Sequence, residues 1–223
     1  MKNKLSIVIT VVLLSVTMIN CSKKDDFSSY NGAIKGTVKD NSGLELHGDL
    51  NSNNIIVRLL GEGDQSPTDI RVNGDGNYQN TKMFPKVYLA WIEGPVVKSD
   101  TVSVNLQGKG IMVQDFVVTP LILAKVMNGT VSGKSVTVDY SLLENAGNLV
   151  DKKEVYCSTV PYPTASTGSL TNVYFTKTVQ LPSISGGVMV DGLASGKYYI
   201  RIGARAKGSV LMNYSNQIII TIP

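Results

Sequence analysis

Short runs of alternating apolar and polar residues dominate the chain after residue 30. The runs are rich in Val, Ile, Thr and Tyr and end at Gly, Asn, Asp or Pro, and none keeps the 3.6-residue period of a helix. Alternation with a period of two buries one face of a strand and leaves the other in water, as in antiparallel sheets that pack face to face. The pattern therefore predicts an all-β protein made of antiparallel β-sandwiches. The clearest runs are Ile34–Val38, Ile55–Leu59, Thr101–Leu106, Ser135–Tyr140 and Tyr198–Ile202.

A proline divides the strand pattern near the middle of the chain. Phe116–Val118 is typical of a closing strand and Leu121–Val126 of an opening one, with Thr119–Pro120 between them. Proline stiffens such a junction and lacks the backbone N–H of a sheet ladder, which favours two separate sandwiches. The pieces on either side have about 90 and about 100 residues, near the common size of one sandwich. We therefore expect a first domain over residues 30–119 and a second over 120–223.

The start of the chain has a different pattern. Two lysines precede an apolar run from Leu5 to Ile19, which stops at Cys21. The run is too short for a membrane-spanning helix and has the organisation of a secretory signal peptide. We expect residues 1–20 to be removed and the polar residues 21–29 to form a spacer between an anchor and the fold.

The residues after Cys21 indicate the type of signal. They resemble the start of a Bacteroidetes lipoprotein, in which lysine and acidic residues just after a lipidated cysteine mark export to the cell surface. The resemblance implies a lipid on Cys21 and a lipid-anchored protein of the outer membrane, on the cell surface. Asn20 stands where lipoproteins usually have Gly, Ala or Ser, so an ordinary signal peptide with an incidental cysteine is the alternative. The expected export signal comprises Ser22, Lys23, Lys24, Asp25 and Asp26.

The charge balance speaks against a nucleic-acid partner. The chain has 21 basic and 17 acidic residues, and loss of the two lysines in the signal lowers the net charge from +4 to +2. No basic stripe remains that could follow a phosphate backbone. The hold on a membrane would therefore come from acyl chains.

The first expected domain carries motifs of a known sandwich family. Gly36–Asp40 as an opening strand, Asp75–Tyr78 as a turn and Phe84–Tyr88 as a step into the next strand resemble the carboxypeptidase regulatory-like, or transthyretin-like, domain. Lys86 stands where that family usually has glycine.

The second expected domain resembles a fibronectin type III or immunoglobulin-like sandwich. Leu193, the run Gly196–Ala204 and then Tyr214–Ser215 are similar to the last two strands of such a domain. Tyr198 shares a face with apolar residues of its strand, so we assign it the inward position of the tyrosine corner.

Taken in order, the lipoprotein start and the two sandwiches resemble a family of two-domain surface lipoproteins of unknown function. The family is encoded beside outer-membrane glycan-import systems of the starch-utilisation (Sus) type. The resemblance implies two kinds of partner: a SusC/SusD-like transporter with its binding lipoprotein, and a polysaccharide or oligosaccharide. It implies no reaction and no cofactor.

Residues that could carry chemistry are few. Asn73, Asp75 and Asn77 have the spacing of half a calcium loop, but Phe84 stands where the closing carboxylate belongs, which favours a hairpin turn. The single histidine, His47, cannot build a zinc site alone. We therefore expect neither a metal nor a cofactor.

A nucleophilic cysteine is equally disfavoured. Once Cys21 carries lipid, Cys157 is the only thiol, in a strand-like stretch typical of a small buried residue. No catalytic motif is present, and the acidic residues are scattered. We expect a protein that is not an enzyme, unless a pocket brings two carboxylates within about 10 Å of each other.

Aromatic residues are the candidates for glycan stacking. Trp91, the only tryptophan, alternates with Tyr88, so an inward Tyr88 would turn Trp91 outward as a platform. The alternative is that Trp91 packs in the core or against the second domain. Tyr162, held between two prolines, and Tyr174, after a Ser/Thr-rich stretch, are expected on exposed loops.

These features give two hypotheses of different class. The first is a non-catalytic surface lipoprotein that binds glycan, or supports a Sus-type uptake complex, through shallow aromatic stacking. The second is a structural or assembly module, in which two rigid sandwiches act as a spacer against the transporter or its partner lipoprotein. A tightly packed junction and a buried Trp91 would favour the second.

Overall fold

The computed structural model describes residues 30–49, 52–108, 110–166 and 176–223. These residues form 16 strands and no α-helix, as the alternating pattern predicts. No helix in this part of the chain has the length and apolarity that a membrane span needs. The strands are β1 (Gly32–Lys39), β2 (Ile56–Gly61), β3 (Thr68–Arg71), β4 (Asn77–Met83), β5 (Val87–Glu93), β6 (Val102–Asn105), β7 (Ile111–Val113), β8 (Phe116–Val117), β9 (Ile122–Ser132), β10 (Ser135–Glu144), β11 (Val150–Ser158), β12 (Thr176–Gln180), β13 (Ser185–Val190), β14 (Gly196–Ala206), β15 (Met212–Tyr214) and β16 (Ile218–Ile222).

Strands β1 to β8 form the N-terminal sandwich. One sheet has the order β4-β1-β7, with β8 also on β1, and the other has the order β3-β2-β5-β6. Their facing sides bury an apolar core because every second residue points inward. That core includes Ile34, Val38, Val57, Leu59, Tyr78, Tyr88, Ala90, Ile92, Val104 and Phe116.

The first sheet of the N-terminal sandwich is mixed rather than purely antiparallel. Strands β7 and β8 run parallel to β1, with Ala33 opposite Ile111 and Val38 opposite Phe116. Strand β6, in the other sheet, ends beside the start of β1. Because the chain crosses to the first sheet at this end, the next strands must run in the same direction as β1. The expectation of antiparallel pairing is wrong for this edge.

Strands β9 to β16 form the C-terminal sandwich. Its sheets have the orders β13-β10-β9 and β12-β11-β14-β15, with β16 on β14. Tyr198 is 3% exposed, and its hydroxyl donates to the carbonyl oxygen of Ala194 at 3.1 Å. This is the inward tyrosine corner that the sequence predicts. Tyr88 makes the same type of bond to the carbonyl of Phe84 at 2.9 Å in the N-terminal sandwich.

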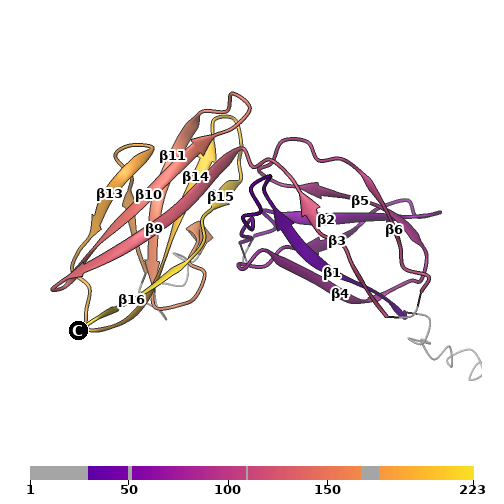
Figure 1. The fold of residues 1–223 in the computed structure, drawn as a ribbon, viewed down its shortest axis with the longest axis horizontal. Helices are drawn as coiled ribbons and strands as arrows, with labels where there is room; N and C mark the ends of the chain where they lie inside the picture. Colours follow the sequence, from indigo (N-terminus) through magenta and orange to yellow (C-terminus); the bar gives the residue numbers. More distant parts are fainter. Residues whose placement is uncertain (1–29, 50–51, 109, 167–175) are drawn as a thin grey trace, which may run out of the picture.

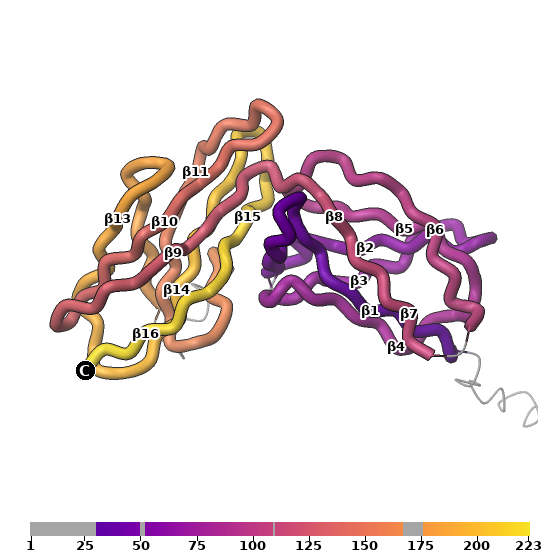
Figure 2. The backbone as a smooth tube through the Cα atoms, in the orientation of Figure 1, coloured from indigo at the N-terminus to yellow at the C-terminus, as the bar shows by residue number. Residues whose placement is uncertain are grey.

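The two sandwiches lie end to end, each with a hydrophobic cluster of its own (Figure 1). Strand β1 begins at the end of the N-terminal sandwich furthest from the C-terminal one (Figure 2). The junction is formed at the opposite end, where His47 bridges to Tyr214 and Val96 bridges to Pro120. The division into domains 30–119 and 120–223 as independent folding units stays a prediction.

Candidate functional site

Trp91 lies on the outer face of the N-terminal sandwich. On β5, the residues Tyr88, Ala90 and Ile92 point into the core and are at most 3% exposed, whereas Leu89 is exposed and Trp91 is half-buried. The period of two along a strand sets this orientation. The indole is therefore outside the sandwich core, as the outward interpretation predicts.

An open groove of about 660 Å³ includes the indole in its wall. Most of its lining comes from β5 and the segment 94–101, including Lys98, Ser99 and Thr101. Leu211 is the one lining residue from the C-terminal sandwich. The groove is thus a shallow surface feature that both sandwiches border.

A charged network fixes the edge of the indole. Trp91 Nε1 donates to Glu93 Oε1 at 3.0 Å, and the same oxygen accepts from Arg58 Nη1 at 3.0 Å. Arg58 Nε also pairs with Asp69 Oδ1 at 3.1 Å. Arg58 lies directly opposite both Trp91 and Asp69 in the sheet ladder, because one register places all three on the outer face.

The two carboxylates that Arg58 holds bear on the question of catalysis. Both lie near one guanidinium, but only Glu93 lines the groove. Glycoside cleavage by paired carboxylates needs both groups to flank one bond of the substrate. The arrangement resembles a positioning network for the indole more than an acid and base pair.

Two asparagines fasten the C-terminal rim of the groove. Asn213 accepts from the backbone N–H of Ile122 at 3.0 Å and donates to the carbonyl of Pro95 at 2.9 Å. Asn54 donates to the carbonyl of Met212 at 3.1 Å. Both asparagines are buried, so these bonds hold β15 against the N-terminal sandwich and keep Leu211 at the groove.

A buried arginine occupies the centre of the junction. Arg201 is 0% exposed, and its Nε and Nη1 donate to the carbonyls of Ser215 at 3.0 Å and Gly48 at 3.3 Å. The ring of Tyr214 lies 4.9 Å from the guanidinium carbon. Burial lowers the pKa of Arg201 to about 10, although the nearby Tyr214 and Asp49 act to raise it. The guanidinium is thus charged at neutral pH.

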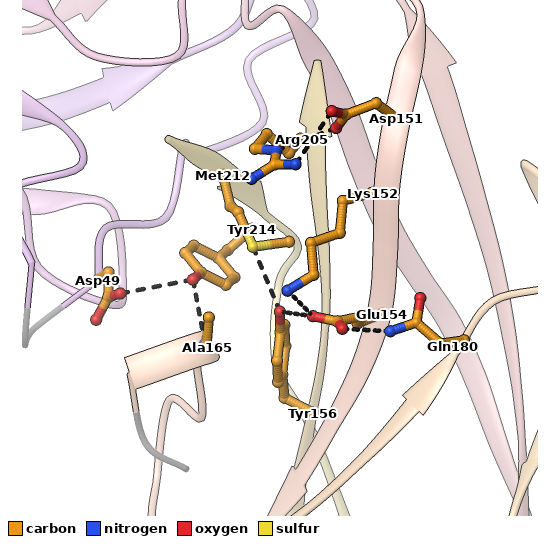
Figure 3. Close-up of polar contacts among 10 residues, drawn as sticks. All are labelled: Asp49, Asp151, Lys152, Glu154, Tyr156, Ala165, Gln180, Arg205, Met212 and Tyr214. Atoms are coloured by element: carbon orange, nitrogen blue, oxygen red, sulfur yellow. Dashed lines mark hydrogen bonds and ion pairs between the residues drawn. The ribbon is translucent and has the colours of Figure 1, made fainter. Parts of the chain in front are cut away.

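Asp49 supplies the negative charge of the junction (Figure 3). It is 2% exposed and accepts hydrogen bonds from Thr164 at 3.0 Å, Ser166 at 3.2 Å and the hydroxyl of Tyr214 at 3.5 Å. Asp49 belongs to the N-terminal sandwich and these three donors to the C-terminal one, while Ser52 of its own sandwich also donates to it at 3.0 Å. The junction is therefore a polar, hydrogen-bonded interface, which fixes how the sandwiches meet.

Tyr162 belongs to this junction and not to an exposed loop, so that expectation is wrong. Tyr162 is half-buried against the backbone of Gly74. The two residues are so close that a β-carbon added to Gly74 would lie 2.4 Å from the Tyr162 ring. Its ring is also 5.9 Å from the Arg201 guanidinium, and its backbone N–H donates to Gln217. Packing between the sandwiches, which a local loop pattern does not reveal, covers part of the Tyr162 ring, and the role of Tyr162 as a glycan platform stays a prediction.

His47 is a neutral member of the same interface. Its Nδ1 donates to the carbonyl of Gly74 at 3.0 Å. Burial lowers the pKa of His47 to about 4, and the positive charge of Arg201 acts in the same direction. In the described residues no group of three or more His, Cys, Asp and Glu side chains is placed to hold a metal ion.

The segment with the spacing of half a calcium loop is a turn, as the sequence favours. Gly76 has a φ of +83°, and the backbone N–H of Asn77 donates to Asp75 Oδ1 at 3.1 Å. Only glycine adopts this φ without cost, so the turn interpretation explains the Asn-Gly-Asp-Gly sequence.

A second polar cluster, which the sequence did not reveal, lies on the C-terminal sandwich near the junction (Figure 3). The carboxylate of Glu154 accepts from the Tyr156 hydroxyl and from Gln180, and pairs with Lys152 at 3.0 Å. Burial, helped by the bond to Glu154, raises the pKa of Tyr156. These groups satisfy one another and form a structural network.

The remaining candidates divide into two groups. Cys157 is 1% exposed, and burial raises the pKa of its thiol to about 12, as suits an inert core residue. Tyr174 and the expected lipidation and export residues Cys21 to Asp26 lie outside the described residues.

Comparison with known proteins identifies the fold. No protein-family model and no curated protein matches the sequence. A DUF3823 family protein from Bacteroides ovatus is 18% identical over 86% of this chain and 100% of its own, with a TM-score of 0.69. One from Parabacteroides merdae is 18% identical over 85% of this chain and 98% of its own, with a TM-score of 0.68.

A third solved structure has the same similarity. It is named a "putative carbohydrate binding protein" from Bacteroides uniformis and is 21% identical over 86% of this chain and 99% of its own, with a TM-score of 0.68. Identities this low show the fold alone. The chain thus has an all-β fold similar to that of DUF3823 family proteins.

Proposed function

We propose that this protein is a non-catalytic lipoprotein of the outer cell surface that binds glycan in the Trp91 groove and supports a Sus-type uptake complex. The observation that carries the proposal is the half-buried, outward indole in the wall of an open groove, with its nitrogen held by Glu93.

The groove has the two kinds of group that a sugar needs. An aromatic face packs against the C–H face of a pyranose ring, and neighbouring polar groups exchange hydrogen bonds with its hydroxyls. Lys98, Ser99, Thr101 and Glu93 line the groove beside the indole. Because the groove is open, single-site affinity would be weak, and many copies on one surface would raise the avidity.

Two further observations support the proposal. A protein of similar fold carries the name "putative carbohydrate binding protein". The sequence before residue 30 supports a lipid anchor at Cys21, and with it the outer-membrane location and the SusC/SusD-like partners.

Affinity electrophoresis of residues 22–223 through native gels that contain plant or host polysaccharides tests the proposal. We expect retardation in at least one gel, which Trp91→Ala abolishes. Tyr199→Ala is the matched control, because Tyr199 is a half-buried outward aromatic residue on β14 beside Lys197. Retardation that survives Trp91→Ala would place binding elsewhere.

The junction favours a second candidate, an assembly spacer. Asp49 and Arg201 are buried between the sandwiches with partners from both sides, which suits a module that holds a fixed shape. In that case no polysaccharide retards the protein, and the anchored protein copurifies with a SusC/SusD-like pair whether or not Trp91 is intact.

A further inference from the structure

We propose that one end of the N-terminal sandwich rests on the lipid membrane surface. It is the end that the expected spacer of residues 21–29, here called the tether, joins. This proposal rests on the lipid anchor of the proposed function. The contact is formed by Phe84 and Ile111, which insert at the level of the lipid headgroups.

Exposed apolar side chains flank the first residues of β1. Gly32 pairs with Met83, so the next residue, Phe84, lies beside the start of β1 on one side. Ala33 pairs with Ile111, which lies on the other side. Phe84 is 44% exposed and Ile111 is 47% exposed. The two apolar residues thus lie on either side of the start of β1.

The apolar patch formed by Phe84 and Ile111 continues along the edge strand β7. All three residues of β7 are exposed, with Met112 at 38% and Val113 at 59%. An exposed apolar strand edge is a liability in water unless something covers it. Within the described residues no further strand pairs with β7.

Aromatic and lysine side chains surround these apolar residues. The rings of Tyr30 and Phe84 are 4.2 Å apart, and Lys86 Nζ is 5.9 Å from the Phe84 ring. Lys35 and Lys82 are exposed on the neighbouring strands β1 and β4. Aromatic rings and snorkelling lysines are the residues that bilayer interfaces favour.

The length of the tether selects the membrane as the occupant. Cys21 is nine residues before Tyr30 in the sequence. Nine residues reach at most about 30 Å when fully extended. The patch would therefore stay within that distance of the acyl chains. Because the anchor keeps the patch at a high effective concentration near the membrane, weak apolar contacts are sufficient to bind it there.

The contact would also orient the groove. β5 runs from Val87, beside the tether end, to Glu93, next to the junction. Trp91 lies near the junction end of β5. When the tether end contacts lipid, Trp91 is therefore held away from the membrane. A surface glycan could then reach the groove without competing with lipid.

Site-directed spin labelling of the full lipidated protein tests this contact in vesicles of phosphatidylethanolamine and phosphatidylglycerol. Ile111→Cys is the probe. Met189→Cys is the matched control, because Met189 is 60% exposed on β13 of the other sandwich. The buried Cys157 has a raised pKa and would stay unlabelled, and lipid would block Cys21.

We expect the label at residue 111 to be at least about threefold less accessible to a water-soluble relaxation agent than the label at 189. A lipid-soluble agent should show the opposite order, and Phe84→Ser should raise aqueous access at 111. Equal access at 111 and 189 on lipidated protein would overturn the membrane contact alone.

Two other results would also overturn the proposal. Spin–spin broadening at residue 111 would show that a second copy of the chain covers the patch. Mass spectrometry that finds no lipid on Cys21 would remove the anchor, and with it both this contact and the proposed location, whatever the gels show about glycan.

Discussion

Trp91 donates its indole N–H to the carboxylate of Glu93, two residues further along the same strand, at 3.0 Å. Residues two apart on a strand share a face, so the acceptor and the ring belong to one outer surface. Arg58 binds the same carboxylate oxygen from the neighbouring strand. The indole is thus held by a carboxylate that itself lines the groove, and Arg58 holds that carboxylate in place.

The first prediction concerns Glu93. Glu93→Ala removes the acceptor and frees the indole to rotate, and we expect glycan affinity to fall about tenfold, the worth of one charged hydrogen bond. Glu93→Gln retains an oxygen acceptor and should lose less. Titration calorimetry with an oligosaccharide measures both variants. Equal losses for Ala and Gln would show that the charge matters, and not the position of the ring.

The second prediction concerns Arg201. Arg201→Met leaves the carbonyls of Gly48 and Ser215 without a donor and Asp49 without a nearby positive charge. We expect the free energy of unfolding to fall by about 3–5 kcal/mol in urea denaturation. The control is Arg205→Met on the same strand.

Arg205 makes an ion pair with Asp151 that is about one-third exposed on both sides. Its replacement should therefore cost much less stability than that of Arg201. Similar losses for Arg201 and Arg205 would mean that the junction contributes little to stability.

The third prediction separates the groove rim from general stability. Asn213→Ala breaks two buried bonds to backbone groups of Ile122 and Pro95, and we expect it to weaken glycan binding severalfold because Leu211 loses its support. Asn216→Ala also breaks two side-chain bonds to backbone, both to Val126 within the C-terminal sandwich.

Both asparagine variants should lower stability by about 1–3 kcal/mol. Only Asn213→Ala should also weaken binding. If Asn216→Ala weakens binding equally, the effect belongs to stability and not to the rim.

The fourth prediction is a pH dependence. Burial lowers the pKa of His47 from 6.5 to about 4, so the unfolded chain takes up a proton at a higher pH than the folded protein. This contribution to stability is present above pH 6.5 and is lost as the pH falls toward about 4, by at most about 3 kcal/mol. His47→Gln removes the titrating group.

Urea denaturation of both proteins across this pH range measures the difference. Several carboxyl groups with lowered pKa values, such as Asp40 and Asp115, also lose stability in acid, but they do so in both proteins. A difference between the two proteins that does not change with pH would contradict the neutral, buried histidine.

The sequence was sufficient for features that depend on one sandwich. Alternation along β5 made an outward Trp91 the consequence of an inward Tyr88, one of two alternatives that the sequence left open, because a period of two assigns each residue to a face. The tyrosine corner at Tyr198 was equally predictable, since its apolar neighbours share that face.

The junction was not predictable in the same way. Arg201 alternates with Ile200 and Ile202 and would be assigned to water, yet it is fully buried. A local pattern says which side chains leave their own core, but not whether solvent or a second sandwich meets them. Tyr162 was misplaced for the same reason.

Fluorescence of the single tryptophan tests the central claim most directly. Trp91 is the only tryptophan of the chain, so its emission reports on the groove without labelling. Residues 22–223 would be titrated with an oligosaccharide of a polysaccharide that retards the protein in gels. We predict a saturable change in Trp91 emission, with the same midpoint as calorimetry. Calorimetric binding without any change in emission, and with full affinity in Trp91→Ala, would contradict the account.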